Sequence, residues 1–229
     1  MAGILYAIPT PLGGTAADAL PVSALKTVKT LRYFVVENAK TARAFLKDVG
    51  MPCAIQELDI SILETDVSKH IKTLQQKHSI GLLSEAGCPA IADPGAALVE
   101  AAQREGIRVV PLVGPSSIVL ALMASGLEGQ RFAFCGYLPR EPEERKRRIR
   151  ELEARSRRES ETQIFIETPY RNDALLASLL EVLSEKTRLC VATGLTLSTE
   201  SIQTLAVARW RRLQHIVGKR PTIFLLFAA

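Results

Sequence analysis

The sequence contains few histidine, cysteine and aromatic residues. There are three histidines and four cysteines among 229 residues, and aromatic residues make up 5% of the chain. The cysteines are far apart and lack the C-x-x-C spacing of metal and redox sites, and no histidine lies in a ligand-like motif. We therefore expect no metal site, and we expect reduced thiols in a cytoplasmic protein.

Long apolar runs are also missing. No run reaches the ~18–20 residues that span a bilayer, and the first residues lack the basic and apolar regions of a secretory signal. We therefore expect no membrane association. No G-x-G-x-x-G follows an expected strand, which disfavours a dinucleotide oxidoreductase. Hydrophobic residues are plentiful at 47%, enough for a substantial core.

Alternating apolar segments predict an α/β fold of two lobes, residues 1–113 and 114–229. In the first lobe we expect strands at 4–8, 33–36, 55–58, 79–83 and 108–112, with helices at 20–31, 39–49, 66–77 and 95–105. In the second we expect helices at 116–124, 141–158, 175–183 and 210–216, with strands at 132–136, 163–167, 188–193, 203–207 and 222–227. The first lobe should hold a mostly parallel sheet, and the strand-rich second lobe a mixed one.

Two loops are rich in small residues, at 83–95 and 113–117. Small residues let the backbone approach a ligand closely, and the helix starts that follow offer free N–H groups. The pattern favours a small-molecule cleft at the carboxyl ends of the strands. Two ordinary tight turns are the alternative.

One segment makes the protein basic. Residues 140–158 hold nine arginines or lysines and five glutamates, a net +4 of the chain's +5. A solvated helix face would explain this segment. A surface for RNA phosphates, with Arg147 and Arg148 as candidate contacts, is the alternative. The segment has no aromatic residue, which argues against base stacking there.

The chain resembles the tetrapyrrole methylase superfamily, the class III S-adenosylmethionine-dependent methyltransferases, and most of all its ribosomal RNA small-subunit cytidine 2′-O-methyltransferase branch. The matching segments, in order, are LYAIPTPLGG at 5–14, LSEAGCPAIADPG at 83–95, PLVGPSSIVLALMASGL at 111–127, RFAFCGYLPRE at 131–141 and FIETPYRN at 165–172. The resemblance implies two α/β lobes with S-adenosylmethionine in the cleft between them, and a homodimer.

The resemblance also implies which residues contact the cofactor. They are Pro11, Ala86, Gly87, Cys88, Ile91, Ser116, Ser117 and Glu167. The helix-start N–H groups suit the cofactor's carboxylate, and main-chain groups can recognise its adenine.

The acceptor side departs from the family pattern. Where the RNA branch has Glu-Asp-Thr-Arg after the second strand, this chain has Glu37-Asn38-Ala39-Lys40. Glu37 and Glu85 are candidate acid–base groups, and Lys40, Arg43 and Arg171 are candidate substrate contacts. Helix or loop capping is the alternative for the two glutamates, and Asp93 is expected to be a helix N-cap.

These observations predict an S-adenosylmethionine-dependent methyltransferase acting on RNA, with ribose 2′-O-methylation of ribosomal RNA as the leading assignment. One alternative is methylation of a tetrapyrrole or another small metabolite, which the lack of the longer members' small C-terminal domain would favour. The other is a cofactor-binding protein without catalytic activity.

Overall fold

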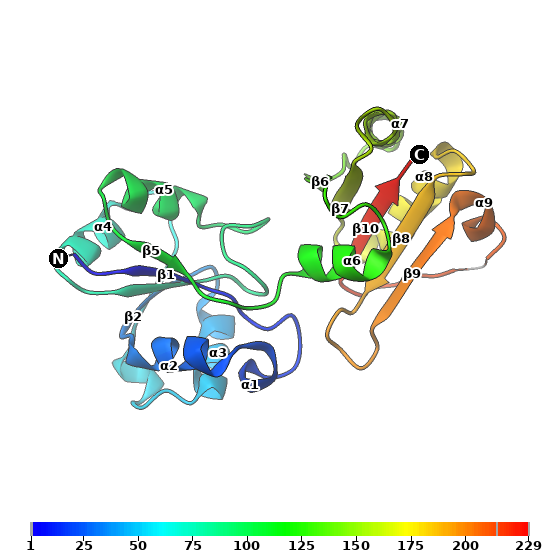
Figure 1. Cartoon of the computed structure of the whole chain (residues 1–229). Coiled ribbons are helices and arrows are strands. Elements are labelled where there is room, and N and C mark those ends of the chain that lie inside the picture. The colour runs from blue at the N-terminus through cyan, green and yellow to red at the C-terminus, as the bar shows by residue number, and fades with distance from the viewer. Residues whose placement is uncertain (1, 214, 229) are drawn as a thin grey trace. The chain divides into compact units, whose positions relative to one another are not determined.

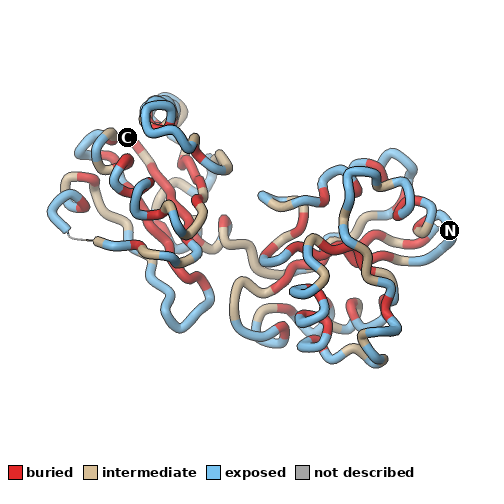
Figure 2. Tube along the Cα trace, turned by 180° about the vertical axis from the view of Figure 1, so that it is seen from behind, coloured by how far each residue is buried: buried red, intermediate tan, exposed pale blue. Residues whose placement is uncertain are grey.

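The computed structural model describes residues 2–213 and 215–228, and the chain folds into two compact units. The N-unit runs to Ser116 and the C-unit begins at Ser117. Each unit has one five-stranded sheet (Figure 1). Buried residues follow the strands of both sheets (Figure 2).

The N-unit sheet is parallel throughout, in the order β3-β2-β4-β1-β5. Its strands are β1 (Leu5–Ile8), β2 (Tyr33–Val36), β3 (Asp59–Ile62), β4 (Ile80–Leu83) and β5 (Val109–Pro111). Its helices are α1 (Ala16–Ala19), α2 (Val22–Thr30), α3 (Ala39–Val49), η1 (Ile55–Glu57), α4 (Ser68–Gln75) and α5 (Ala96–Arg104). Helices α1–α3 pack in one hydrophobic cluster and α4–α5 in another, so both faces of the sheet are covered.

Neighbouring residues of a strand supply opposite faces of this sheet. In β2, Phe34 and Val36 pack with α2 and α3, whereas Val35 packs with α4 and α5. Such strands are apolar on both sides because side chains alternate across the sheet.

The C-unit sheet is mixed, in the order β6-β7-β10-β8-β9. Its strands are β6 (Phe132–Tyr137), β7 (Thr162–Ile166), β8 (Arg188–Thr193), β9 (Ser201–Ala206) and β10 (Thr222–Phe227). Its helices are α6 (Ser117–Ser125), α7 (Pro142–Glu159), η2 (Pro169–Arg171), α8 (Asn172–Val182) and α9 (Val207–Trp210). Strands β6 and β7 are parallel and the other pairs are antiparallel. Helices α7, α8 and α9 share one core with this sheet.

The predicted fold class, with one parallel and one mixed sheet, is confirmed. Two predicted elements are wrong. The segment 55–58 is not a strand, because the edge strand that pairs with β2 begins at Asp59. The helix predicted at 210–216 lies instead at Val207–Trp210, where Trp210 is fully buried. Within the described residues, no helix is both long and apolar enough to cross a membrane.

Candidate functional site

Loops gather at the carboxyl edge of the N-unit sheet. All five strands run in the same direction, so the segments that follow β1, β2, β4 and β5 lie along one edge. Residues 84–95, here the β4 loop, follow the strand that lies between β2 and β1. The small-residue loops singled out in the sequence are thus neighbours at this edge.

Hydrogen bonds tie the β4 loop to the loops on either side. The backbone groups of Thr10 and Gly87 pair reciprocally, with N···O distances of 2.9 and 3.0 Å. Pro11 follows Thr10 in this joined turn and is half-buried. The Sγ atom of Cys88 donates to the carbonyl of Pro115 over 3.4 Å. These contacts fix the main chain of the loop at the sheet edge.

The β4 loop also presents main-chain donors. Gly87 has a φ of +79°, a backbone conformation that favours glycine. A Cβ at this position would also lie only 3.3 Å from Leu12 Cδ2, so there is little room for a side chain. Among the described residues, the amides of Ala86 and Cys88 have no hydrogen-bond acceptor. Ile91 in the same loop is 52% exposed and adds apolar surface. Such a loop suits a ligand with an anionic or carbonyl group and an apolar part.

Three carboxylates lie at this edge. The Glu85 amide donates to Glu37 Oε2 over 3.1 Å, joining the ends of β2 and β4. Burial, together with the charges of Glu37 and Glu85, raises the pKa of Asp93 to about 6, against an opposing hydrogen bond from Ser84. A carboxyl group with this pKa can take up or release a proton near neutral pH.

The expectation that Asp93 caps a helix is wrong. Helix α5 has Gly95 as its N-cap residue, with no side-chain cap. Sequence reasoning therefore missed Asp93 as an ionisable group of the site. The available signal was its place in the same small-residue loop as Glu85, one strand away from Glu37.

The cations predicted near Glu37 are not all at the edge. Asn38 caps α3, because its Oδ1 accepts from the amide of Lys40 over 2.9 Å, so Glu37 is not needed as the cap. Lys40 is exposed in the first turn of that helix. Arg43 instead lines a cavity of about 310 Å³ with side chains from η1 and the start of β3.

Ser116 and Ser117 stand where the units meet in sequence, both half-buried. Ser116 is the last residue of the N-unit, in the segment that follows β5, and Ser117 begins α6.

In the C-unit, Glu167 directly follows β7. Its side chain is fully buried, and its Oε1 accepts from the Thr168 amide over 2.7 Å and pairs with the Arg171 guanidinium. Its Oε2 is buried without a hydrogen-bond partner among the described residues. An unpartnered buried carboxylate oxygen is unfavourable, so it suits a donor group of a ligand. The guanidinium of Arg171, a candidate substrate contact, is therefore engaged in an ion pair within the C-unit.

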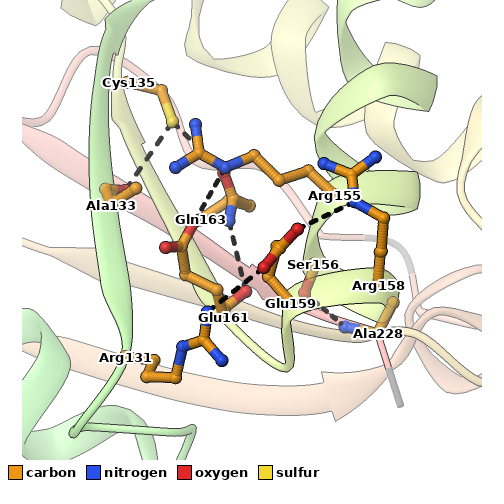
Figure 3. Close-up of polar contacts among 10 residues, drawn as sticks. All are labelled: Arg131, Ala133, Cys135, Arg155, Ser156, Arg158, Glu159, Glu161, Gln163 and Ala228. Carbon is orange, nitrogen blue, oxygen red and sulfur yellow. Dashed lines mark hydrogen bonds and ion pairs between the residues drawn. The ribbon is translucent and has the colours of Figure 1, made fainter.

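Helix α7 separates its charges into a buried and an exposed set. Arg145 and Glu153 are buried, and Arg145 donates to Ser178 on α8 over 3.0 Å. At the carboxyl end, Arg155 pairs with Glu161, while Arg158 and Arg131 both pair with Glu159 (Figure 3).

The middle of α7 carries the exposed cations without partners. Arg148 is half-buried and pairs with Glu151 over 3.0 Å. Arg147 and Arg150 are exposed, and neither has an ion-pair partner among the described residues. The net positive charge of this helix is therefore available to solvent chiefly at these two residues.

Residues 5–208 match the sequence profile of the tetrapyrrole (corrin/porphyrin) methylases. The chain belongs to this family. It is accordingly a methyltransferase, as the sequence predicted. Ribosomal RNA small subunit methyltransferase I of Vibrio cholerae is 33% identical over 207 residues, which cover 90% of this chain and 70% of the relative.

Solved structures of methyltransferases share the fold of this family member. The methyltransferase CobJ superposes with a TM-score of 0.65 and 16% identity, over 100% of this chain and 95% of the other. Uroporphyrin-III-C-methyltransferase from Thermus thermophilus has a TM-score of 0.56 and 17% identity, over 99% and 93% of the two chains.

Proposed function

We propose that this methyltransferase uses S-adenosylmethionine to methylate ribosomal RNA, with a ribose 2′-hydroxyl as the acceptor group. The observation that carries the acceptor class is the 33% identity, over 90% of the chain, to a relative named ribosomal RNA small subunit methyltransferase I. The family itself supports a methyl donor of this kind.

The carboxyl edge of the N-unit fits S-adenosylmethionine. The unpaired amides of Ala86 and Cys88 suit its carboxylate, and the exposed side chain of Ile91 suits an apolar part of the molecule. The carboxylates at the same edge complement a sulfonium cation. When bound, the cofactor supplies an activated methyl group. In the C-unit, Glu167 Oε2 offers an acceptor for a hydroxyl or amino group.

The acidic residues of the edge supply proton transfer in this proposal. A ribose hydroxyl must lose its proton as it is methylated, and Glu37, Glu85 and Asp93 are the carboxylates gathered to accept it. Glu37 also holds the Glu85 amide, so it positions the β4 loop as well. Alignment of the acceptor oxygen with the methyl carbon supplies the rest of the rate enhancement.

The α7 helix supports an RNA acceptor through its exposed charges. Arg147 and Arg150 are free to contact phosphates, with Arg148 beside them once its pair with Glu151 exchanges. Lys40 offers a further exposed cation in the N-unit. Replacing Arg147 and Arg150 by glutamate should weaken RNA binding and reduce its salt dependence.

Two further features belong to the same proposal. An enzyme that modifies ribosomal RNA would work in the cytoplasm of a bacterium, where ribosomes are assembled. The family resemblance also implies a homodimer, and sedimentation equilibrium would report its mass directly.

Methyl transfer to transcribed small-subunit ribosomal RNA tests this function. With methyl-labelled S-adenosylmethionine, the protein should label the RNA, and digestion with nuclease and phosphatase should release a 2′-O-methylated nucleoside. Label in a tetrapyrrole but not in RNA would overturn the acceptor assignment. Label in neither, with intact cofactor binding, would support a cofactor-binding protein instead.

A further inference from the structure

Two exposed tyrosines lie at the carboxyl ends of neighbouring parallel strands in the C-unit. Strands β6 and β7 run in the same direction, and Tyr137 is paired in register with Ile166. Tyr137 is 56% exposed, and Tyr170, which follows β7, is 80% exposed. Both aromatic rings are therefore presented at one edge of the sheet in a chain that is only 5% aromatic.

A cation is held against one of these rings. The Nζ atom of Lys219 lies 5.0 Å from the centroid of the Tyr170 ring. The loop that carries Lys219 is anchored by Asn172, which is fully buried and whose Nδ2 donates to the carbonyls of Gly218 and Arg220 over 3.0 and 2.7 Å. The backbone on either side of Lys219 is thus held by hydrogen bonds, and the ammonium group lies against the Tyr170 ring.

The loop after β6 is fixed in the same way. Buried Arg145 donates through Nη1 to the carbonyl of Arg140 over 3.0 Å, and Leu138 is buried. The side chain of Arg140 is exposed beside this anchored backbone. The turn from Tyr137 to Arg140 therefore presents an aromatic ring and a cation on a rigid support.

Two carboxylates at this edge are already engaged. Glu167 is buried and paired with Arg171, and the exposed Asp173 accepts from the amides of Val217 and Gly218. Glu141 is exposed next to Arg140. Exposed rings with lysine and arginine among them match a ligand that has flat bases and a negative backbone. The carboxylates of an acidic peptide would pair with the cations but would not stack on the two rings.

We propose that this edge binds unpaired nucleotides of the RNA acceptor, with bases stacked on Tyr170 and Tyr137 and phosphates held by Lys219 and Arg140. Unpaired RNA offers splayed bases to such surfaces, whereas a paired helix hides them. This binding site depends on the proposed function, because it requires RNA as the acceptor. It specifies the part of the C-unit that binds the single strand. Its aromatic rings lie outside helix α7, which has no aromatic residue, while Arg140 lies just before that helix in the same basic segment.

Fluorescence anisotropy with an end-labelled single-stranded RNA tests the site. Tyr170→Ala should weaken binding roughly 5- to 100-fold, as expected for the loss of one stacked base, while Tyr170→Phe should retain wild-type affinity. Lys219→Gln should lower the slope of log affinity against log salt by about 0.7, the value for one phosphate contact in a single strand. Phe132→Ala, 44% exposed at the amino end of the same strand β6, is the matched control and should bind normally.

The outcomes separate this site from the proposed function. If Tyr170→Ala binds the RNA as the wild type does, or if the wild type does not bind single-stranded RNA, the site is wrong. If Tyr170→Ala loses affinity for S-adenosylhomocysteine but not for RNA, the ring serves the cofactor and the site is also wrong. If the wild type binds the RNA but labels no RNA in the methyl-transfer assay, the proposed function fails while the binding site stands.

Discussion

The backbone amide of Glu85 donates to Oε2 of Glu37 over 3.1 Å, and this contact joins the loops that follow two neighbouring strands. The carboxylate that was a candidate base in the sequence thus also positions the loop that would hold the cofactor. Its charge acts on a third residue, because Glu37 contributes to the raised pKa of Asp93. One side chain, Glu37, therefore both positions the β4 loop and raises the pKa of Asp93.

Removing the charge of Glu37 should lower the pKa of Asp93. Glu37→Gln keeps an oxygen that can accept from the Glu85 amide, so the loop should stay in place while the like charge is lost. The pKa should fall from about 6 toward the ordinary aspartate range. Titration of the Asp93 carboxyl carbon by NMR measures it, with Glu100→Gln as control because that exposed glutamate does not contribute to the shift. Equal shifts in both variants would contradict the coupling.

Asp93→Asn should change stability in a pH-dependent way. The folded-state pKa of about 6 lies above the ordinary 3.8, so the folded protein binds this proton more tightly than the unfolded chain does. The stability from this group is therefore fully present below about pH 4 and is lost as the pH rises through 6. We expect the variant to match the wild type at pH 4 and to exceed it by about 1 kcal/mol at pH 7.5, since solvent screens a half-buried group. Urea unfolding at the two pH values checks this, and a variant less stable at pH 7.5 would contradict it.

Gly87→Ala should impair cofactor binding beyond its effect on stability. Gly87 and Gly14 both have positive φ, at +79° and +77°, so alanine should cost each about 1 kcal/mol. A Cβ on Gly87, in the β4 loop, would lie only 3.3 Å from Leu12 Cδ2. A Cβ on Gly14 would lie 3.9 Å from its nearest neighbour, Asp18 Oδ2. S-adenosylhomocysteine affinity, measured by calorimetry, should therefore fall in Gly87→Ala alone. A parallel loss in Gly14→Ala would point to instability as the cause.

Two arginines two positions apart on α7 should behave differently. Arg145 is buried and bonded to Ser178 and to the Arg140 carbonyl, so Arg145→Ala should cost about 1–3 kcal/mol of unfolding free energy. Exposed Arg147 should tolerate alanine within about 0.5 kcal/mol. Denaturant melts of both variants compare them directly. Similar losses in the two would mean that Arg147 also has a structural role.

Much of the fold followed from the sequence because buried strands and amphipathic helices have clear signatures. Helix 39–49 and strands 33–36, 188–193 and 222–227 were predicted with the bounds that the structure has. The strand Asp59–Ile62 was missed because it lies at the sheet edge with exposed ends, so its hydrophobic pattern is weak. The short helix that ends at Trp210 was misplaced because its burial depends on strands distant in the sequence.

The sequence predicted only those parts of the site that depend on the backbone conformation of a single loop. Glycine and small residues marked the β4 loop, including Gly87. The raised pKa of Asp93 depends on burial and on charges brought in from neighbouring loops, so spacing could not show it. Likewise, Tyr137 and Tyr170 reach one edge only through the parallel pairing of β6 with β7.

Calorimetric titration of the purified protein with S-adenosylmethionine and S-adenosylhomocysteine, with NADH as control, shows whether the protein binds the methyl donor. We expect saturable binding of both sulfur compounds and none of NADH. Absence of binding by either sulfur compound would contradict the cofactor assignment, and with it the proposed methylation of RNA.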